Sequence, residues 1–311
     1  MGSSRSSLVR ALEGGFGIQY WGESYTAPDL AAAPHGLLIL EATRVGTHET
    51  SAEGEILFGC DEVSEIRQSG KCVLGYLNLT EIEVYRDYWR DHARQTSPDG
   101  LYSAAWIGPR TAEDERLARY WTPAWEELLL TRIDRLMARG FDGVFLDDLL
   151  HYFSFVSGEE LDWWGTGPGP RSTAFATAMM ELVVTVADCV RKQRPDAIVV
   201  VNNGVFLPGD AAAETGPASD VLTERYLEAI DGILVESVFG SGENAVTHQA
   251  LAERYSKRGI SVLTVDFADQ VGAVTQRPFR EYVQSRAAGL GFVPYAVDDP
   301  MFDRLYPPLT G

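Results

Sequence analysis

The sequence predicts a single (β/α)8 barrel, and three observations lead to this fold class. Eight short apolar runs, rich in β-branched residues, alternate with longer segments that have helical spacing. The chain has 311 residues, a normal length for one barrel of this kind. The rival fold, an open doubly wound sheet, needs a glycine-rich turn after its first strand. The segment "QYWGESYTAP" at that place has one glycine.

The predicted strands are continuous apolar runs, as in "VLGYLNL" and "AIVVVNNG". Such runs are typical of parallel strands that are buried on both faces. Their ranges are 16–21, 36–42, 72–79, 143–148, 197–204, 232–237, 260–268 and 291–299. We expect residues 1–14 to form an N-terminal tail or a short helix, and residues 15–311 to form the barrel domain.

Four longer segments between these strands have apolar residues at helical spacing. The clearest is "WTPAWEELLLTRIDRLMARG", in which Leu129, Ile133 and Leu136 recur on one face and Gly140 ends the pattern. The predicted helices span 121–140, 172–195, 244–259 and 277–291. They fall between predicted strands, as the crossovers of a barrel require.

The net charge of −19 limits the classes of partner. Nucleic acids and anionic membranes both need a basic face, so we expect neither as a partner. The charge is compatible with a cationic substrate, and equally with an acidic surface that only keeps the protein in solution. We expect a carbohydrate or small-molecule substrate, and the oligomeric state stays open.

No run of 18 apolar residues occurs, and the N-terminus has no apolar signal region. We therefore expect a cytoplasmic protein, or a secreted one if a signal sequence has been removed. The three cysteines are scattered and the five histidines lack metal-ligand spacing. We accordingly predict no disulfide framework, no metal and no cofactor.

Polar residues gather where the predicted strands end. In a barrel these ends meet at one rim, and the active site is built there. Carboxylates stand at or near six of the eight ends, whereas the strand interiors are apolar. The predicted substrate-contact residues are Tyr20, Trp21, Glu41, Asn78, Glu81, Asp148, Asn202, Asp266, Tyr295 and Asp298.

Two of the strands repeat one pattern, "DGVFLD" and "DGILVE", and these end in Asp147 and Glu236. Side chains alternate along a strand, so both acids should lie at the same height and face the same mouth. Asp148 should then point toward the helices or begin the loop. Two facing carboxyls are what glycoside hydrolysis requires. An equally open alternative is that each acid caps the following helix or pairs with an arginine.

A second alternative use of the acidic rim is a hard metal ion such as Mg²⁺ or Ca²⁺. Asp147, Asp148, Glu236, Asp266 and Asp298 could supply its oxygen ligands. However, the sequence has no calcium-loop spacing, so we do not expect a metal site.

The stretch "VLGYLNLTEIEVYRDYW", together with "GFDGVFLDDLLHYF" and "IDGILVESVF", resembles a known family. It is the TM1410-like group of glycoside hydrolases, related to the endo-α-1,4-polygalactosaminidases of glycoside hydrolase family 114. The family pattern after the third strand is Y-[LI]-S-[IL]-G-E-A-E-x-Y-R-x-Y-W. The matching residues are Tyr76, Leu77, Leu79, Glu81, Glu83, Tyr85, Arg86, Tyr88 and Trp89. Asn78, Thr80 and Ile82 depart from it.

The resemblance covers roughly residues 16–300 and implies a barrel that hydrolyses carbohydrate. It implies that Asp147 and Glu236 are the catalytic carboxyls and that Glu81 lines the sugar site. Arg86 is expected to orient a carboxylate such as Glu81 or Glu83. One departure bears on the substrate: the family often has an aspartate where this chain has Leu150, which His151 follows.

We therefore predict a glycoside hydrolase that cleaves an α-linked glycoside, with an amino sugar as one candidate. Asp147 is the favoured nucleophile or base and Glu236 the favoured general acid. The alternative is a non-hydrolytic sugar- or metabolite-binding protein, or a repurposed biosynthetic-pathway protein, on the same barrel. Both the missing secretion signal and Leu150 favour that alternative.

Overall fold

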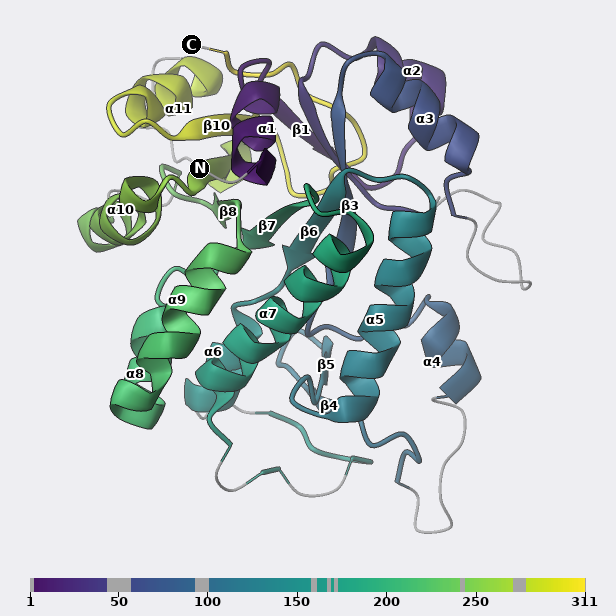
Figure 1. Cartoon of the computed structure of the whole chain (residues 1–311), viewed down its shortest axis with the longest axis vertical. Helices are drawn as coiled ribbons and strands as arrows, with labels where there is room; N and C mark the ends of the chain where they lie inside the picture. Colours follow the sequence, from purple (N-terminus) through teal and green to yellow (C-terminus); the bar gives the residue numbers. More distant parts are fainter. Residues whose placement is uncertain are drawn as a thin grey trace.

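The chain folds into a nearly closed barrel of eight parallel strands with interleaved helices, as the computed structural model shows (Figure 1). The structure describes residues 3–43, 57–92, 101–157, 161–166, 169–170, 173–240, 244–270 and 278–310. The barrel strands, in spatial order, are β1 (Phe16–Gln19), β2 (Leu37–Leu40), β3 (Cys72–Asn78), β6 (Gly143–Asp147), β7 (Ile198–Asn202), β8 (Gly232–Glu236), β9 (Ser261–Phe267) and β10 (Val293–Val297). The predicted fold class is confirmed, and each predicted strand contains one of these strands.

Every neighbouring pair from β1 to β10 runs parallel. The first and last strands approach one another through their side chains. The Phe16 and Tyr295 rings lie 5.2 Å apart between centroids, and the backbone N–H of Tyr20, just after β1, donates to the carbonyl of Phe302, after β10, at 2.9 Å. These contacts hold the two ends of the sheet together.

The helices surround the strands, with α5, α7 and α9 side by side along one flank (Figure 1). The helices are α1 (Ser3–Leu12), α2 (Ala27–Ala32), α3 (Cys60–Gln68), α4 (Asp87–His92), α5 (Pro123–Ala138), α6 (His151–Ser157), α7 (Phe175–Gln193), α8 (Leu207–Thr215), α9 (Ser219–Ala229), α10 (Ala245–Ala250) and α11 (Phe279–Ala288). A π-helical turn (Leu251–Tyr255) and a 3-10 turn (Ser256–Arg258) continue α10. The four predicted helices are therefore present.

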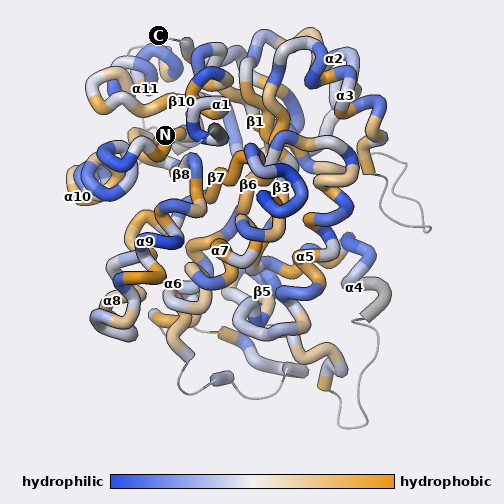
Figure 2. The backbone as a smooth tube through the Cα atoms, in the orientation of Figure 1, coloured by the Kyte–Doolittle hydropathy of each residue, from blue (hydrophilic) through white to orange (hydrophobic). Residues whose placement is uncertain are grey.

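Two apolar layers follow from the alternation of side chains along the strands. One layer lies between the strands and the helices, and the other fills the barrel interior. Figure 2 shows β6 and β7 as largely hydrophobic, whereas α5 carries both kinds of residue. The interior residues on the strands are Phe16, Ile18, Leu37, Ile39, Leu74, Tyr76, Phe145, Ile198, Val200, Leu234, Leu263, Val265, Phe267, Tyr295 and Val297.

Helix α1 closes the end of the barrel at which the strands begin. Leu8 and Leu12 pack into the interior cluster. Ser4 donates a 2.7 Å hydrogen bond to Asp231, which directly precedes β8, and Arg5 donates to the carbonyl of Leu227 at 2.6 Å. The helix thereby covers apolar side chains that water would otherwise reach.

A two-stranded hairpin, β4 (Ile107–Arg110) and β5 (Arg116–Ala118), was not predicted from the sequence. It lies in the connection between β3 and β6, and its second strand bonds the chain that leaves β3. The N–H of Ala118 donates to the Thr80 carbonyl at 2.7 Å, and the N–H of Ile82 to the Arg116 carbonyl at 2.7 Å. The hairpin thereby holds the segment that contains Glu81.

Among the helices in the described part of the chain, none is long and apolar enough to cross a membrane.

Candidate active site

Two carboxyl groups meet at the mouth of the barrel, at the ends of β6 and β8. Phe145 and Leu234 belong to the barrel interior, so Asp147 and Glu236, two residues further along each strand, face the same way. Both side chains are partly buried. The predicted alternation therefore brings the two acids together.

Asn202, at the end of β7 between them, joins the two acids. Its Nδ2 atom donates to Asp147 Oδ1 at 2.5 Å and to Glu236 Oε1 at 2.8 Å. An amide nitrogen carries two protons, so it can serve both acceptors at once. Asn202 is only 3% exposed, which fixes the bridge in one place. The two carboxyl oxygens are therefore held by a single buried atom.

The two acids differ in their hydrogen bonds. Asp147 accepts from Asn202 and from the backbone N–H of Asp148 at 2.9 Å. Burial raises the pKa of Asp147, and these two donors oppose that rise. Burial and the nearby Asp147 charge raise the pKa of Glu236 to about 7, and the Asn202 amide opposes the rise. The pKa of each carboxyl is therefore raised, and Asp147 accepts the larger number of hydrogen bonds.

Asp148 begins the loop after β6, which is one of the two placements expected for it. Its φ angle is 59°, in the left-handed region, so the chain turns and the side chain faces the exit of β3. There Asn78 donates a short hydrogen bond to Asp148, and Thr80 donates to its carbonyl at 2.7 Å. Asp148 thus lies at the rim, next to the carboxyl pair.

Glu81 lies beside Asp148 and forms a second carboxyl pair with it. Asn78 Nδ2 contacts both carboxyls and lies 3.4 Å from Glu81 Oε2. Burial and the charges of Glu83, Glu115 and Asp147 raise the pKa of Glu81 to about 7. Burial and the Asp147 and Glu81 charges raise the pKa of Asp148 well above its usual range. Each of these two carboxyls therefore makes the other harder to ionise.

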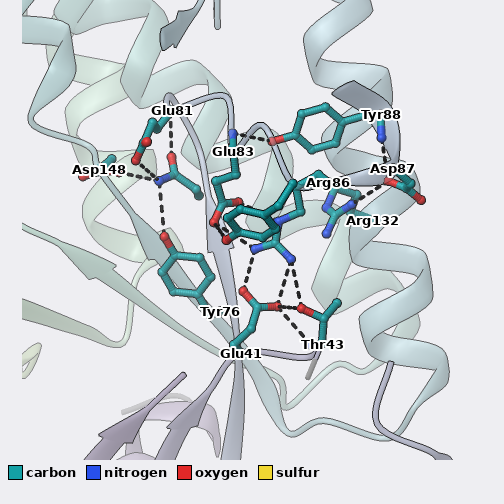
Figure 3. A network of polar contacts seen from close by, with 12 residues as sticks. Glu41, Thr43, Tyr76, Glu81, Glu83, Arg86, Asp87, Tyr88, Arg132 and Asp148 are labelled. Carbon is teal, nitrogen blue, oxygen red and sulfur yellow. Dashed lines mark hydrogen bonds and ion pairs between the residues drawn. The ribbon is translucent and has the colours of Figure 1, made fainter. Parts of the chain in front are cut away.

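A third group of acids, Glu41 and Glu83, is paired with a cation, Arg86, unlike the carboxyls described above. Arg86 is 2% exposed and lies between Glu41 and Glu83 (Figure 3). It donates to Glu41 Oε2 at 2.5 Å and to Glu83 Oε2 at 2.8 Å. Burial would raise the pKa of Glu41, but Arg86 and the Thr43 backbone N–H lower it below the usual value. Of the two glutamates expected beside Arg86, Glu83 contacts it, whereas Glu81 lies with Asn78 and Asp148.

Tyr20, at the end of β1, faces the carboxyl pair from across the mouth. Its ring packs on Tyr76 at 4.6 Å and on Phe302 at 5.3 Å between centroids. After burial, the charges of Asp147 and Glu236 are the largest causes that raise its pKa. Trp21 lies nearby and donates through Nε1 to the carbonyl of Met301 at 2.8 Å. Both aromatics therefore belong to the rim.

Three predicted contact residues lie away from the carboxyl pair. Asp266 stands between Val265 and Phe267 of the barrel interior, so it faces outward, where it accepts from the N–H of Phe239 at 2.6 Å. Tyr295 is fully buried inside the barrel, and its hydroxyl accepts from the chain after β10. Asp298 is a surface residue whose side chain is 70% exposed. The prediction treated every strand end alike, although only alternate positions face the mouth.

Tyr76 lies next to Asn78 at the mouth and was not among the predicted site residues. It precedes Asn78 by two positions on β3, so both side chains face the mouth. Asn78 Nδ2 lies 3.2 Å from the Tyr76 hydroxyl oxygen. The same alternation that found Asp147 could have found Tyr76.

Within the described residues, no group of three or more histidine, cysteine, aspartate and glutamate side chains is arranged to hold a metal ion. The acids at the rim are linked through Asn78, Asn202 and Arg86 instead. These amide and guanidinium donors occupy carboxylate oxygens that a hard cation would need.

Sequence comparison places most of the chain in one family. Residues 47–306 match the model of glycoside-hydrolase family GH114. An uncharacterized protein of Methanocaldococcus jannaschii is 23% identical over 89% of this chain and 74% of its own length. One of Deinococcus radiodurans is 27% identical over 78% of this chain and 69% of its own.

Two solved structures share the fold. Aspergillus fumigatus Ega3, in complex with galactosamine, has a TM-score of 0.61 and 10% identity, and the match covers 95% of this chain and 94% of that one. The glycoside hydrolase domain of PelA from Pseudomonas aeruginosa has a TM-score of 0.56 and 16% identity, with 94% and 98% covered. At sequence identities this low, the similarity to these two structures shows a common fold.

Proposed function

Because the chain belongs to glycoside-hydrolase family GH114 and is a glycoside hydrolase, we propose that it cleaves an α-linked glycoside with Asp147 and Glu236 as its catalytic carboxyls. The observation that carries this assignment is the bridge from Asn202 to both acids. Family membership favours hydrolysis over the alternative of a non-hydrolytic binding protein.

Asp147 is the nucleophile in this proposal. Two hydrogen-bond donors, the Asn202 amide and the backbone N–H of Asp148, contact its carboxyl, and donors to a carboxylate favour the ionised form. Glu236 is the general acid, because its raised pKa of about 7 keeps a proton available for the leaving oxygen. In the second step, Glu236 changes from general acid to general base. Glu236, now ionised, takes a proton from water as that water attacks the glycosyl–Asp147 ester.

The spacing of the two acids supports retention of configuration. Their bridged oxygens both lie within 2.8 Å of Asn202 Nδ2, so they are no further apart than these two hydrogen bonds placed end to end. Retaining enzymes have carboxyls about 5–5.5 Å apart, whereas inverting enzymes leave roughly 6.5–9.5 Å for a water molecule. The bridge leaves too little room for the inverting arrangement.

An amino sugar is the proposed substrate class. Four carboxyls, those of Glu81, Asp147, Asp148 and Glu236, meet at the mouth, whereas the nearby Arg86 is already bonded to Glu41 and Glu83. Such a site attracts a cationic ring substituent such as an ammonium group. The Ega3 structure contains galactosamine, and its barrel resembles this one.

The remaining predictions on the whole chain stay proposals. We propose one barrel domain over residues 15–311, preceded by the segment that forms α1. We propose that the chain has no nucleic-acid partner, on the grounds of the net charge of −19.

Two matched substitutions test the assignment. Asp147→Asn and Glu236→Gln each keep the side-chain shape and remove the acid. We expect Asp147→Asn to lower kcat at least about 1,000-fold on every substrate, because it removes the nucleophile. Glu236→Gln should lose as much on galactosaminogalactan, but far less on a 4-nitrophenyl α-glycoside, whose leaving group departs without a proton. Full activity in either variant would remove that residue from the chemistry.

A further inference from the structure

The amide of Asn202 bonds one particular oxygen of each acid in the carboxyl pair. Its Nδ2 atom donates to Asp147 Oδ1 at 2.5 Å and to Glu236 Oε1 at 2.8 Å. The backbone N–H of Asp148 donates to the same Oδ1 atom at 2.9 Å. All three hydrogen bonds therefore end on Oδ1 and Oε1, and the oxygens that remain for a substrate are Asp147 Oδ2 and Glu236 Oε2.

The orientation of this amide serves the two acids at the expense of its own oxygen. Asn202 is 3% exposed, and no donor in the described part of the chain reaches its buried Oδ1 atom. A buried acceptor without a partner costs free energy, so an asparagine with a purely structural role would normally satisfy both ends of its amide. Turning the amide over would set its oxygen against the Asp147 carboxylate. The bridge through Nδ2 is therefore what this residue provides.

The donor on Oε1 decides which oxygen of Glu236 carries the proton. A protonated carboxyl group has one O–H donor, and its other oxygen can only accept. Because Oε1 faces an N–H of Asn202, a proton on Oε1 would point at another proton. The proton of neutral Glu236 therefore belongs on Oε2. Burial and the nearby Asp147 charge raise the pKa of Glu236 to about 7, so this proton is available near neutral pH.

We propose that Asn202 is a positioning residue that assigns a task to one oxygen of each acid: it keeps the proton of Glu236 on Oε2 and leaves Asp147 Oδ2 as the attacking atom. This inference rests on the proposed function, in which Asp147 attacks and Glu236 donates the proton.

The two catalytic steps then use the same pair of oxygens. In the first step, Asp147 Oδ2 bonds the anomeric carbon, the bond from that carbon to the leaving oxygen breaks, and the Glu236 Oε2 proton passes to the leaving oxygen. In the second step, water attacks the same carbon, one of its protons passes to Oε2, and the bond to Oδ2 breaks. The Asn202 amide stays bonded to Oδ1 and Oε1 throughout, so neither carboxyl has to turn between the steps.

Loss of this amide should move the whole pH profile of the enzyme. The Asn202 hydrogen bonds oppose the rise in the pKa of both acids, so without them both should ionise at higher pH. The acidic limb of kcat/KM, set by Asp147, and the basic limb, set by Glu236, should each move up by about one unit. Because both reacting oxygens lose their orientation, kcat on galactosaminogalactan should fall about 100-fold while KM changes little.

The other titratable groups around the two acids stay the same in an Asn202 variant. They stand at or after the ends of β1, β2, β3 and β6, and they are Tyr20, Glu41, Tyr76, Glu81, Asp148 and His151. A change in both limbs of the profile therefore reports the loss of the bridge.

The test is Asn202→Leu, which keeps the shape of the side chain and removes both N–H donors. The matched control is Gln19→Met, which removes another buried amide, at the end of β1. The Gln19 amide donates to the carbonyls of Trp21 and Asp303 at 3.0 and 3.1 Å, and to no carboxyl. We expect both limbs to move in Asn202→Leu and neither in Gln19→Met. A folded Asn202→Leu protein with the wild-type pH profile and kcat would overturn the proposal, and so would an equal shift in Gln19→Met.

A second variant keeps the proposal testable if Asn202→Leu fails to fold. Asn202→Asp has the same size, but it replaces the shared donor with a third acceptor beside the two acids. The same upward shift of both limbs is expected, with kcat at neutral pH lower by at least about 100-fold. Wild-type kcat in this folded variant would contradict the inference. The proposed function is judged separately, because it fails if Asp147→Asn or Glu236→Gln keeps full activity.

Discussion

The two ends of β6 and β8 carry the same kind of residue in opposite surroundings. Asp142 and Asp231 precede these strands, and Asp147 and Glu236 end them. Asp231 accepts from Arg191 at 3.0 Å and from the backbone N–H of Val199 at 2.9 Å. At the other end, the acids are bridged by an uncharged amide.

In both strands, the acid before the strand has contacts suited to stability, whereas the acid at its end has surroundings suited to function. At the start of the strands, an acid that pairs with an arginine and with the backbone of a neighbouring strand holds these segments together. At the end of the strands, burial without a paired cation raises the pKa of Glu236 to about 7. In barrels the first end is where stability is built, and the second is where reactions occur. In "DGVFLD" and "DGILVE", the first acid therefore stabilises the barrel, and the last acid faces the candidate active site.

The largest expected effect on stability is at the start of β8. Asp231 is 1% exposed and bonds Ser4, Arg191 and the Val199 backbone. Asp231→Ala should lower the free energy of unfolding by about 3 kcal/mol, because it leaves a partly buried arginine and a buried strand N–H without their acceptor. Urea denaturation followed by circular dichroism measures this change.

Asp142→Ala is the companion variant. The Asp142 side chain is 18% exposed, so solvent can replace part of what it provides and the loss should be smaller. If Asp231→Ala were as stable as the wild type, the stabilising half of the comparison would fail.

The second expected effect is a pH dependence of stability that comes from Glu236, at the C-terminal end of β8. The pKa of Glu236 is raised from 4.5 to about 7, so the folded protein favours its protonated form. Its contribution to stability is therefore fully present below pH 4.5 and is lost as the pH rises to about 7. Between pH 4.5 and 7, the wild type should lose about 1–3 kcal/mol that Glu236→Gln does not lose.

The measurement is the unfolding free energy of both proteins at several pH values. Acids distant from the mouth contribute equally to each, so the difference reports Glu236 together with its electrostatic effect on Asp147 and Asp148. Parallel curves for the two proteins would show that Glu236 has an ordinary pKa, and the general-acid assignment would lose its electrostatic basis.

The smallest expected effect concerns helix α1. Ser4→Ala removes the 2.7 Å hydrogen bond to Asp231 and should cost about 1 kcal/mol. Thermal unfolding would show a slightly lower Tm with unchanged kcat, because α1 lies at the end of the barrel opposite to the site. A fall in kcat at full stability would mean that the two ends are not independent.

Much of the fold follows from local pattern. The eight apolar runs predict the strands because each is short, continuous and bounded by polar residues. Period-two alternation was enough to place Asp147 and Glu236 together at the mouth. It left the place of Asp148 open between the helices and the start of the loop, because the left-handed turn at that residue is accompanied by bonds to Asn78 and Thr80, which lie about seventy positions earlier in the chain.

Other features depend on contacts between distant segments, which periodicity does not encode. The β4–β5 hairpin forms where it can bond the chain around Glu81. Arg86 reaches Glu41 across 45 positions, and only the folded barrel brings them together. Asp266 was predicted at the mouth because strand ends were considered without their faces, and its neighbours Val265 and Phe267 occupy the interior instead.

The most direct test of the central claim, that Asp147 attacks and Glu236 assists, is to trap the ester between the sugar and the enzyme. Glu236→Gln should form this ester from a 4-nitrophenyl α-glycoside and hydrolyse it slowly, because the base for the second step is missing. Mass spectrometry of the digested protein should then find the sugar on the peptide that contains Asp147. A sugar attached to another residue, or an unmodified enzyme that releases a product of inverted configuration, would contradict the account.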